Sequence, residues 1–193
     1  MDNLWIDYFL KQPENRFLCR VDNNFIQSKA SKIKDQFPFT HLPEALEFLL
    51  NGRTEISNNI MEEAKILYGL IHAQYLMTEA GQEQMLAKFH NHDFEKCPRT
   101  LCKNCQCLPF GSKSIYGKSK LQLFCPNCTD SYNIPGNDNR TLDGSFFGPD
   151  WFHFLLQKHP EDPELFPPEP PAPFVPKIYG FKVYNPSLHP VSS

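Results

Sequence analysis

The sequence lacks the short motifs by which a protein kinase transfers phosphate. It contains no glycine-rich phosphate loop, no lysine in a Val-Ala-Ile-Lys context and no His-Arg-Asp catalytic loop. Kinase-type phosphoryl transfer depends on these groups to hold the nucleotide, the metal ions and the attacking hydroxyl. We therefore predict that the chain does not catalyse this reaction and is not itself an enzyme of that class.

Long apolar runs and an excess of one charge are also missing. No run approaches the roughly 20 residues that a membrane-spanning helix needs. The 19 Lys and Arg against 22 Asp and Glu leave a net charge of −3, which does not favour a nucleic-acid or membrane-surface role. Residues 1–10 carry no basic region of the kind that opens a signal peptide. We therefore expect a protein of the cytoplasm and nucleus, whose thiols stay reduced.

What the sequence does contain is a cluster of cysteines, because six of the seven lie between Cys97 and Cys128. Cys97 and Cys102 form one close pair, and Cys125 and Cys128 form a second in the knuckle sequence Cys-Pro-Asn-Cys. Two such pairs, separated by a loop of about twenty residues, can supply four thiolates to one tetrahedral zinc ion. Four thiolates leave no place for a reactive water, so a structural zinc is favoured over a hydrolytic one.

The spacing leaves open which two cysteines form the first pair of ligands. Cys102 and Cys105 also form a Cys-x-x-Cys pair, and Cys107 follows two residues later. Unpaired or disulfide-bonded thiols are the alternative to a metal, but a reducing compartment favours the metal. Cys19 stands apart and is interpreted as a small buried hydrophobe, since nothing suggests that it meets His41, the nearest histidine in the sequence.

Residues 1–93 predict an all-α domain. Its strongest signal is an apolar stripe at helical spacing, formed by Ile60, Ala64, Leu67, Ile71 and Tyr75. A shorter stripe predicts a helix that Thr40 caps and Gly52 ends. His72 lies one residue from the main stripe, and we interpret it as a packing residue rather than a ligand.

Residues 94–147 predict a small zinc ribbon, which gives the chain an α+β fold class. Short strands over 108–110, 120–124 and 131–134 would form an antiparallel sheet with the cysteine knuckles at one end. Such a sheet buries too little apolar surface to stand alone, so the metal would hold it together. The aromatic residues of 148–159 predict a short helix that packs back on the α domain.

Residues 160–193 predict an extended proline-rich tail, because more than half of the 18 prolines lie there. Within it, the segment 174–184 carries more large apolar groups than a purely solvated tail would. Its alternation predicts a strand or a hairpin that presents aromatic side chains to a partner, with Gly180 allowing a turn. A partner in the same chain and one in another chain are both consistent with this pattern.

A series of short motifs runs along the chain: Trp5-Ile-Asp-Tyr-Phe, Phe17-Leu-Cys-Arg-Val-Asp, Leu67-Tyr-Gly-Leu-Ile-His-Ala-Gln-Tyr, Cys97-Pro-Arg, Cys125-Pro-Asn-Cys, Asp143-Gly-Ser-Phe-Phe-Gly, His159-Pro and Lys177-Ile-Tyr-Gly-Phe-Lys-Val. In this order the motifs resemble the regulatory beta subunit family of casein kinase II, over nearly the whole chain. The combination of the Leu67 motif, the Lys177 motif and the cysteine pairs is highly specific.

The resemblance implies a non-catalytic regulatory subunit of this Ser/Thr protein kinase. It implies that two zinc ribbons pack into a homodimer, and that this dimer binds two catalytic alpha subunits and modulates their stability, activity and substrate choice. The zinc ligands that it implies are Cys97, Cys102, Cys125 and Cys128. The alpha subunit would bind the C-terminal segment, where the implied anchors are Ile178, Tyr179 and Phe181.

The chain departs from the family pattern in several places, and two of them bear on regulation and on the metal site. The family's acidic loop corresponds to residues 51–59, where the charged residues are Arg53 and Glu55, and this weakens the expectation of regulation by polycations. Cys105 and Cys107 are extra thiols beside the implied ligands, and they could exchange with those ligands or oxidise.

The alternative function is a zinc ribbon that binds nucleic acid, which would require a basic surface. A modest local excess of cations does lie in the ribbon, at Arg99, Lys103, Lys113, Lys118 and Lys120. Few aromatic residues for base stacking accompany them, so this alternative is less favoured.

Overall fold

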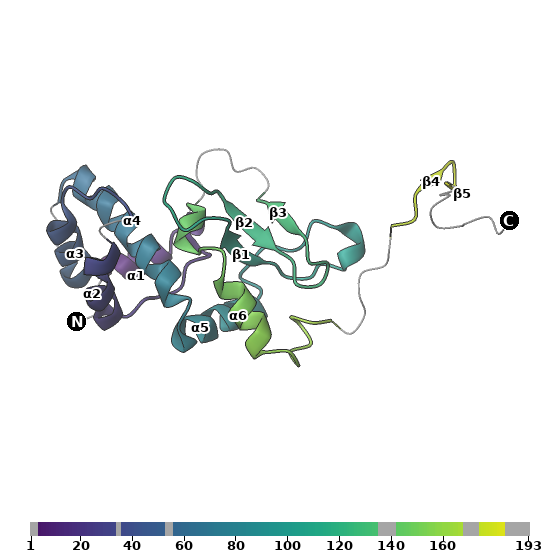
Figure 1. Ribbon diagram of the computed structural model, residues 1–193, viewed down its shortest axis with the longest axis horizontal. Helices are drawn as coiled ribbons and strands as arrows, with labels where there is room; N and C mark the ends of the chain where they lie inside the picture. The colour runs from purple at the N-terminus through teal and green to yellow at the C-terminus, as the bar shows by residue number, and fades with distance from the viewer. Residues whose placement is uncertain (1–3, 34–35, 53–55, 135–141, 168–173, 184–193) are drawn as a thin grey trace.

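The computed structural model describes residues 4–33, 36–52, 56–134, 142–167 and 174–183. Helices form the first half, and a small antiparallel sheet, a short helix and a hairpin follow (Figure 1). The predicted mixture of helices and a small antiparallel sheet is confirmed. Arg53, Glu55 and the parts of the predicted tail at 168–173 and 184–193 lie outside the described residues.

The helical part is built around one long helix. Its elements are α1 (Leu4–Leu10), the 3-10 turn η1 (Pro13–Asn15), α2 (Asn23–Ile33), α3 (Leu42–Asn51), α4 (Asn58–Tyr75) and α5 (Glu79–His90). Helix α4 contacts α2 and α3, and it also contacts the later 3-10 turn η3 (Gly144–Phe146). Ala64, Leu67 and Ile71 of the predicted stripe are buried in the core, so the stripe is the face that holds these elements together.

The ends of α3 are set partly by another helix. Gly52 ends α3 as predicted, in the left-handed conformation with φ 66°. The prediction that Thr40 caps this helix is wrong, because His41 occupies the N-cap position without a side-chain cap. Instead, the Glu63 carboxylate on α4 accepts the Thr40 and His41 N–H groups at 3.1 and 2.7 Å.

The sheet contains the three expected strands, β1 (Leu108–Gly111), β2 (Leu121–Phe124) and β3 (Ser131–Asn133), in the order β1-β2-β3. Both pairings are antiparallel, with Leu108 opposite Phe124 and Leu123 opposite Tyr132. A proline fits β1 because this strand lies at the edge of the sheet. The Pro109 carbonyl accepts the indole N–H of Trp151 at 3.0 Å, which ties β1 to α6 (Trp151–Lys158).

Helices and sheet share one cluster of buried apolar side chains. Ile71 of α4, Leu108 and Leu121 of the sheet, and Trp151 of α6 all belong to it. The core is continuous across residues 93 and 147, so burial marks no boundary between domains at either position. The predicted division of the chain into domains there stays a prediction. Among the described helices, none is both long enough and apolar enough to cross a bilayer.

Candidate metal centre and docking hairpin

Two loops bring four cysteine sulfurs to one point. Cys97 and Cys102 precede β1, whereas Cys125 and Cys128 lie in the turn between β2 and β3. The four Sγ atoms lie within 4.8 Å of one another, with Cys97–Cys128 at 3.8 Å and Cys102–Cys125 at 3.5 Å. A tetrahedral ion with Zn–S bonds near 2.3 Å needs sulfurs about 3.8 Å apart. The arrangement could therefore hold a metal ion, and it is compatible with zinc.

Backbone hydrogen bonds fold each pair into a tight turn. The Cys97 N–H donates to the Cys105 carbonyl at 2.7 Å, and the Cys105 N–H donates to the Cys102 carbonyl at 3.2 Å. In the second turn, the Cys125 N–H donates to the Asp130 carbonyl at 3.0 Å. These bonds belong to the turns from which the four sulfurs converge.

Polar side chains also surround the sulfurs. The Asn127 amide donates to Cys102 Sγ at 3.3 Å, and the Tyr132 hydroxyl lies 3.2 Å from Cys128 Sγ. Hydrogen bonds of this kind orient metal ligands and adjust their charge.

The pKa shifts of the clustered thiols bear on what the site could bind. Burial raises the pKa of Cys97 and Cys102, and the neighbouring cysteines raise it further. Cys125 is the exception, because hydrogen bonds from the Cys105 and Cys107 thiols lower its pKa. Four thiolates at these distances would repel one another, so ionising all four would call for a bound cation, and zinc is one that thiolates prefer.

The geometry separates the four clustered sulfurs from the two extra thiols. Cys105 and Cys107 pack against the same group of buried residues, but neither belongs to the four-sulfur set. The alternative pairing through Cys-x-x-Cys at Cys102 and Cys105, which the spacing left open, is therefore not the one that gathers the sulfurs.

The C-terminal aromatic segment forms a hairpin, one of the two forms that the pattern predicted. Strands β4 (Lys177–Ile178) and β5 (Phe181–Lys182) pair, with Ile178 opposite Phe181 and Lys177 opposite Lys182 (Figure 1, yellow). Tyr179 and Gly180 form the turn with φ of 48° and 86°, the positive values that a type I′ turn requires. Tyr184, the end of the predicted segment, lies outside the described residues.

The hairpin side chains are open to solvent. Ile178, Tyr179 and Phe181 are 61%, 97% and 79% exposed. A two-stranded hairpin is only marginally stable alone in water, and exposed apolar groups gathered in one place mark interaction surfaces.

A buried histidine that we interpreted from sequence as a packing residue meets Cys19. His72 is fully buried, and its Nε2 lies 3.4 Å from Cys19 Sγ and accepts the Cys19 N–H at 3.0 Å. Its Nδ1–H donates to the Phe146 carbonyl at 2.7 Å. His41 is nearer to Cys19 along the chain, and the separation of 53 residues between Cys19 and His72 gave no sign that α4 would bring the two together.

The Cys19–His72 pair is structural rather than nucleophilic. Burial raises the pKa of Cys19 to about 12 and lowers the pKa of His72 to about 4, so both groups are neutral near pH 7. An activated cysteine needs a thiolate, which this site disfavours. The imidazole instead joins the 19–21 segment, α4 and η3 through its two ring nitrogens.

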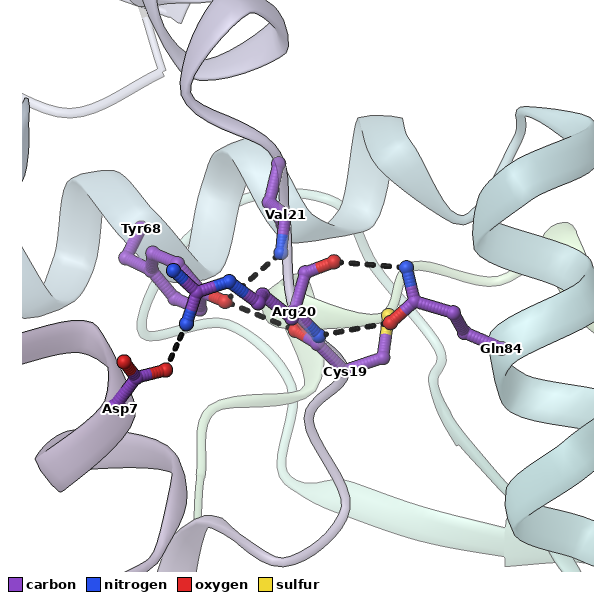
Figure 2. Close-up of polar contacts among 6 residues, drawn as sticks. All are labelled: Asp7, Cys19, Arg20, Val21, Tyr68 and Gln84. Atoms are coloured by element: carbon purple, nitrogen blue, oxygen red, sulfur yellow. Dashed lines mark hydrogen bonds and ion pairs between the residues drawn. The ribbon is translucent and has the colours of Figure 1, made fainter. Parts of the chain in front are cut away.

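The backbone of the 19–21 segment forms hydrogen bonds with side chains, where a strand would pair with the backbone of a neighbouring strand (Figure 2). The Gln84 amide accepts the Arg20 N–H at 3.1 Å and donates to the Arg20 carbonyl at 2.9 Å. The Tyr68 hydroxyl donates to the Cys19 carbonyl at 2.9 Å and accepts the Val21 N–H at 3.2 Å. Arg20 also pairs with Asp7 of α1.

We expect His72 to make the fold less stable as the pH decreases below about 6.5. The unfolded chain binds a proton at His72 near its ordinary pKa of 6.5, whereas the folded chain does so only near 4. The free energy of unfolding should therefore fall by about 2 kcal/mol between pH 7 and pH 5 from this group. Urea denaturation at the two pH values measures the change.

A pair of variants isolates the effect of His72. His72→Gln should lose most of the pH dependence between pH 7 and pH 5. His92→Asn removes an exposed histidine at a left-handed position, which asparagine tolerates, and should keep it. Equal pH dependence in the wild type and His72→Gln would contradict this role.

Comparison with known proteins gives a consistent result. The sequence profile described as casein kinase II regulatory subunit matches residues 4–182. Casein kinase II subunit beta of Schizosaccharomyces pombe is 35% identical over 186 residues, which cover 94% of this chain and 79% of that protein. Suppressor-of-stellate-like protein of Drosophila melanogaster is 35% identical over 192 residues, covering 100% and 84%. Casein kinase II subunit beta' of Drosophila melanogaster is 33% identical over 189 residues, covering 95% and 85%.

Proposed function

The chain belongs to the casein kinase II regulatory subunit family, and from this we propose that it binds the kinase catalytic subunit as a zinc-dependent homodimer. The regulatory role follows from the family, whose members are not themselves catalytic. The proposal adds which residues make the contacts. It also places the chain in the cytoplasm and nucleus, where its free thiols would stay reduced.

The exposed hairpin is the observation that carries the proposal. Because Ile178 and Phe181 are directly opposite, their side chains project from the same face of the hairpin. Tyr179 stands at the tip, and Lys177 and Lys182 occupy the other face. In the described part of the chain, Ile178, Tyr179 and Phe181 are exposed to water. A pocket on the catalytic subunit could bury them by binding this apolar face of the hairpin.

The metal centre supports the second part of the proposal. Zinc would hold the turns at Cys97 and Cys125 against each other, and so fix β2 and β3 in the ribbon. Two ribbons related by a two-fold axis would then present two hairpins from one particle. Each dimer would bind two catalytic chains, and the second binding would benefit from a raised effective concentration.

Co-purification with a casein kinase II catalytic subunit tests the proposal. The full chain is expected to form a complex with two copies of each protein, observed by sedimentation, with zinc measured in the same sample. A change in the kinase's activity toward a peptide substrate on complex formation would report regulation. A zinc-loaded chain that sediments alone in the presence of the catalytic subunit would overturn the assignment.

A further inference from the structure

A cavity of about 800 Å³ opens where the helical part of the chain meets the loop that precedes β2. Phe9 of α1, Ile66 of α4 and Phe146 of η3 line its apolar part, and Lys118 and Lys120 of the loop line its polar part. The volume falls within the range of roughly 300–1,000 Å³ that ligand pockets span. Neither the four clustered cysteines nor the hairpin contributes to it.

Two lysines of the cavity have no acidic partner. Lys118 and Lys120 are exposed, and neither forms an ion pair within the described part of the chain. The third lysine of the cavity, Lys65, is already paired with Glu62 at 2.7 Å. Two ammonium groups are therefore available to an anionic ligand.

Backbone hydrogen bonds hold the loop that carries these lysines. The Gly117 N–H donates to Asp143 Oδ2 at 2.9 Å, and the Gly144 N–H donates to the Ser119 carbonyl at 2.8 Å. The other oxygen of Asp143 accepts the Ser145 N–H at 2.9 Å, so this carboxylate is already bound by two backbone donors. An anchored loop loses little conformational freedom when a ligand binds.

An unpaired acceptor also faces the cavity. Asn15 lines the cavity and is 5% exposed, and its Nδ2 donates to the Phe9 carbonyl at 2.8 Å. No described residue donates to its Oδ1, and this oxygen is not among the unpartnered side-chain atoms that are sealed from solvent. Asn15 Oδ1 is therefore open to the cavity and would accept an N–H or O–H from a ligand.

We propose that this cavity binds an acidic peptide segment of a partner protein. Carboxylates of the peptide pair with Lys118 and Lys120, and a backbone N–H of the peptide donates to Asn15 Oδ1. An apolar side chain of the same segment packs against Phe9 and Ile66. The site is separate from the metal centre and from the hairpin that would bind the catalytic subunit.

The charges of the cavity favour a peptide over a nucleic acid. Glu14 and Glu62 also line it, and they would repel a chain that carries a negative charge at every phosphate. A peptide can place its carboxylates at Lys118 and Lys120 and present neutral N–H groups to the oxygens of Glu14 and Asn15. The ligand therefore needs both anionic groups and neutral donors, which an acidic peptide supplies.

Fluorescence anisotropy of a fluorescein-labelled peptide, Glu-Phe-Asp-Asp-Leu-Glu, titrated with the full chain tests the proposal. We expect binding that weakens as salt is added. Lys118→Glu should weaken binding by about tenfold or more, because it replaces an attraction by a repulsion. Lys113→Glu is the matched control, since it makes the same change at an exposed lysine outside the cavity, and it should keep the affinity.

A second variant tests the apolar wall without changing any charge. Ile66→Ala should weaken binding of the peptide severalfold, because it removes apolar surface that the Phe or Leu of the peptide would cover. An unchanged affinity in both Lys118→Glu and Ile66→Ala would overturn the proposal. An equal loss in Lys118→Glu and Lys113→Glu would also overturn it, because the attraction would then be a general effect of charge.

Competitors identify the kind of ligand. Inorganic phosphate that displaces the peptide more strongly than chloride at equal ionic strength would overturn the peptide assignment in favour of a small-anion site. A single-stranded oligonucleotide that binds more tightly than the peptide would overturn it in favour of nucleic acid. Phe181→Ala should bind the peptide as the wild type does, so a failure of this site and a failure of the hairpin can be told apart.

Discussion

Replacing Cys125 by serine should give a protein that binds no zinc and no longer forms a dimer. Cys125 is fully buried at the end of β2, and its sulfur lies 3.5 Å from that of Cys102. In small zinc domains the metal contributes on the order of 10–16 kcal/mol to folding. Leu108 and Leu121 pack into the core shared with the helices, but Leu123 and Tyr132 pack against the cysteines in a separate small cluster. The apolar burial in that small cluster is less than the metal contributes, so the loss of metal should unfold this part of the ribbon.

Three measurements on the Cys125→Ser variant test this prediction: metal content, sedimentation, and hydrogen exchange of the β2 and β3 amides. We expect loss of metal, monomers, and faster exchange in both strands, while the amides of α4 stay protected. Cys19→Ala removes a cysteine outside the cluster and should keep the metal and the dimer. A Cys125→Ser protein that still binds one zinc ion and sediments as a dimer would refute the role assigned to the metal.

Replacing Phe181 by alanine should weaken binding of the catalytic subunit by about 2 kcal/mol or more, which corresponds to about thirtyfold in Kd. Phe181 is 79% exposed in the free chain and lies on the same face as Ile178. An aromatic side chain that passes from water into a partner's pocket gains a large apolar burial, which its truncation removes. Calorimetry with the purified catalytic subunit measures the change.

Two further variants make the Phe181 result specific. Phe154→Ala removes an aromatic side chain on α6 that is 48% exposed, and it should leave the affinity unchanged. Tyr179→Gly suits the positive φ of the turn, so any loss of affinity reports the tyrosine side chain rather than a broken hairpin. An unchanged affinity in Phe181→Ala would remove the hairpin as the docking site.

Local spacing predicted the elements that depend on residues close together in the sequence. The three short strands follow from alternation between cysteine knuckles, and the end of α3 follows from a glycine that accepts a positive φ. Helix α2 was not predicted, although its buried residues Ile26, Ala30 and Ile33 fall at the helical spacing of four and three residues, so its apolar stripe was a signal that went unused. Asp22, which accepts the Phe25 N–H at 2.8 Å, was the available signal for its start.

The sequence by itself determined that the chain has helices, a cysteine-rich ribbon and an aromatic C-terminal segment, because each depends on residues close together along the chain. The spacing left open which four of the six clustered cysteines converge, and the family resemblance implied the four that the structure gathers. Only the tertiary structure decided that His72 meets Cys19, and that Gln84 and Tyr68 hold the 19–21 segment. Those contacts join residues far apart in the sequence. They arise when packing of α4, α5 and the sheet around one core fixes where each side chain lies.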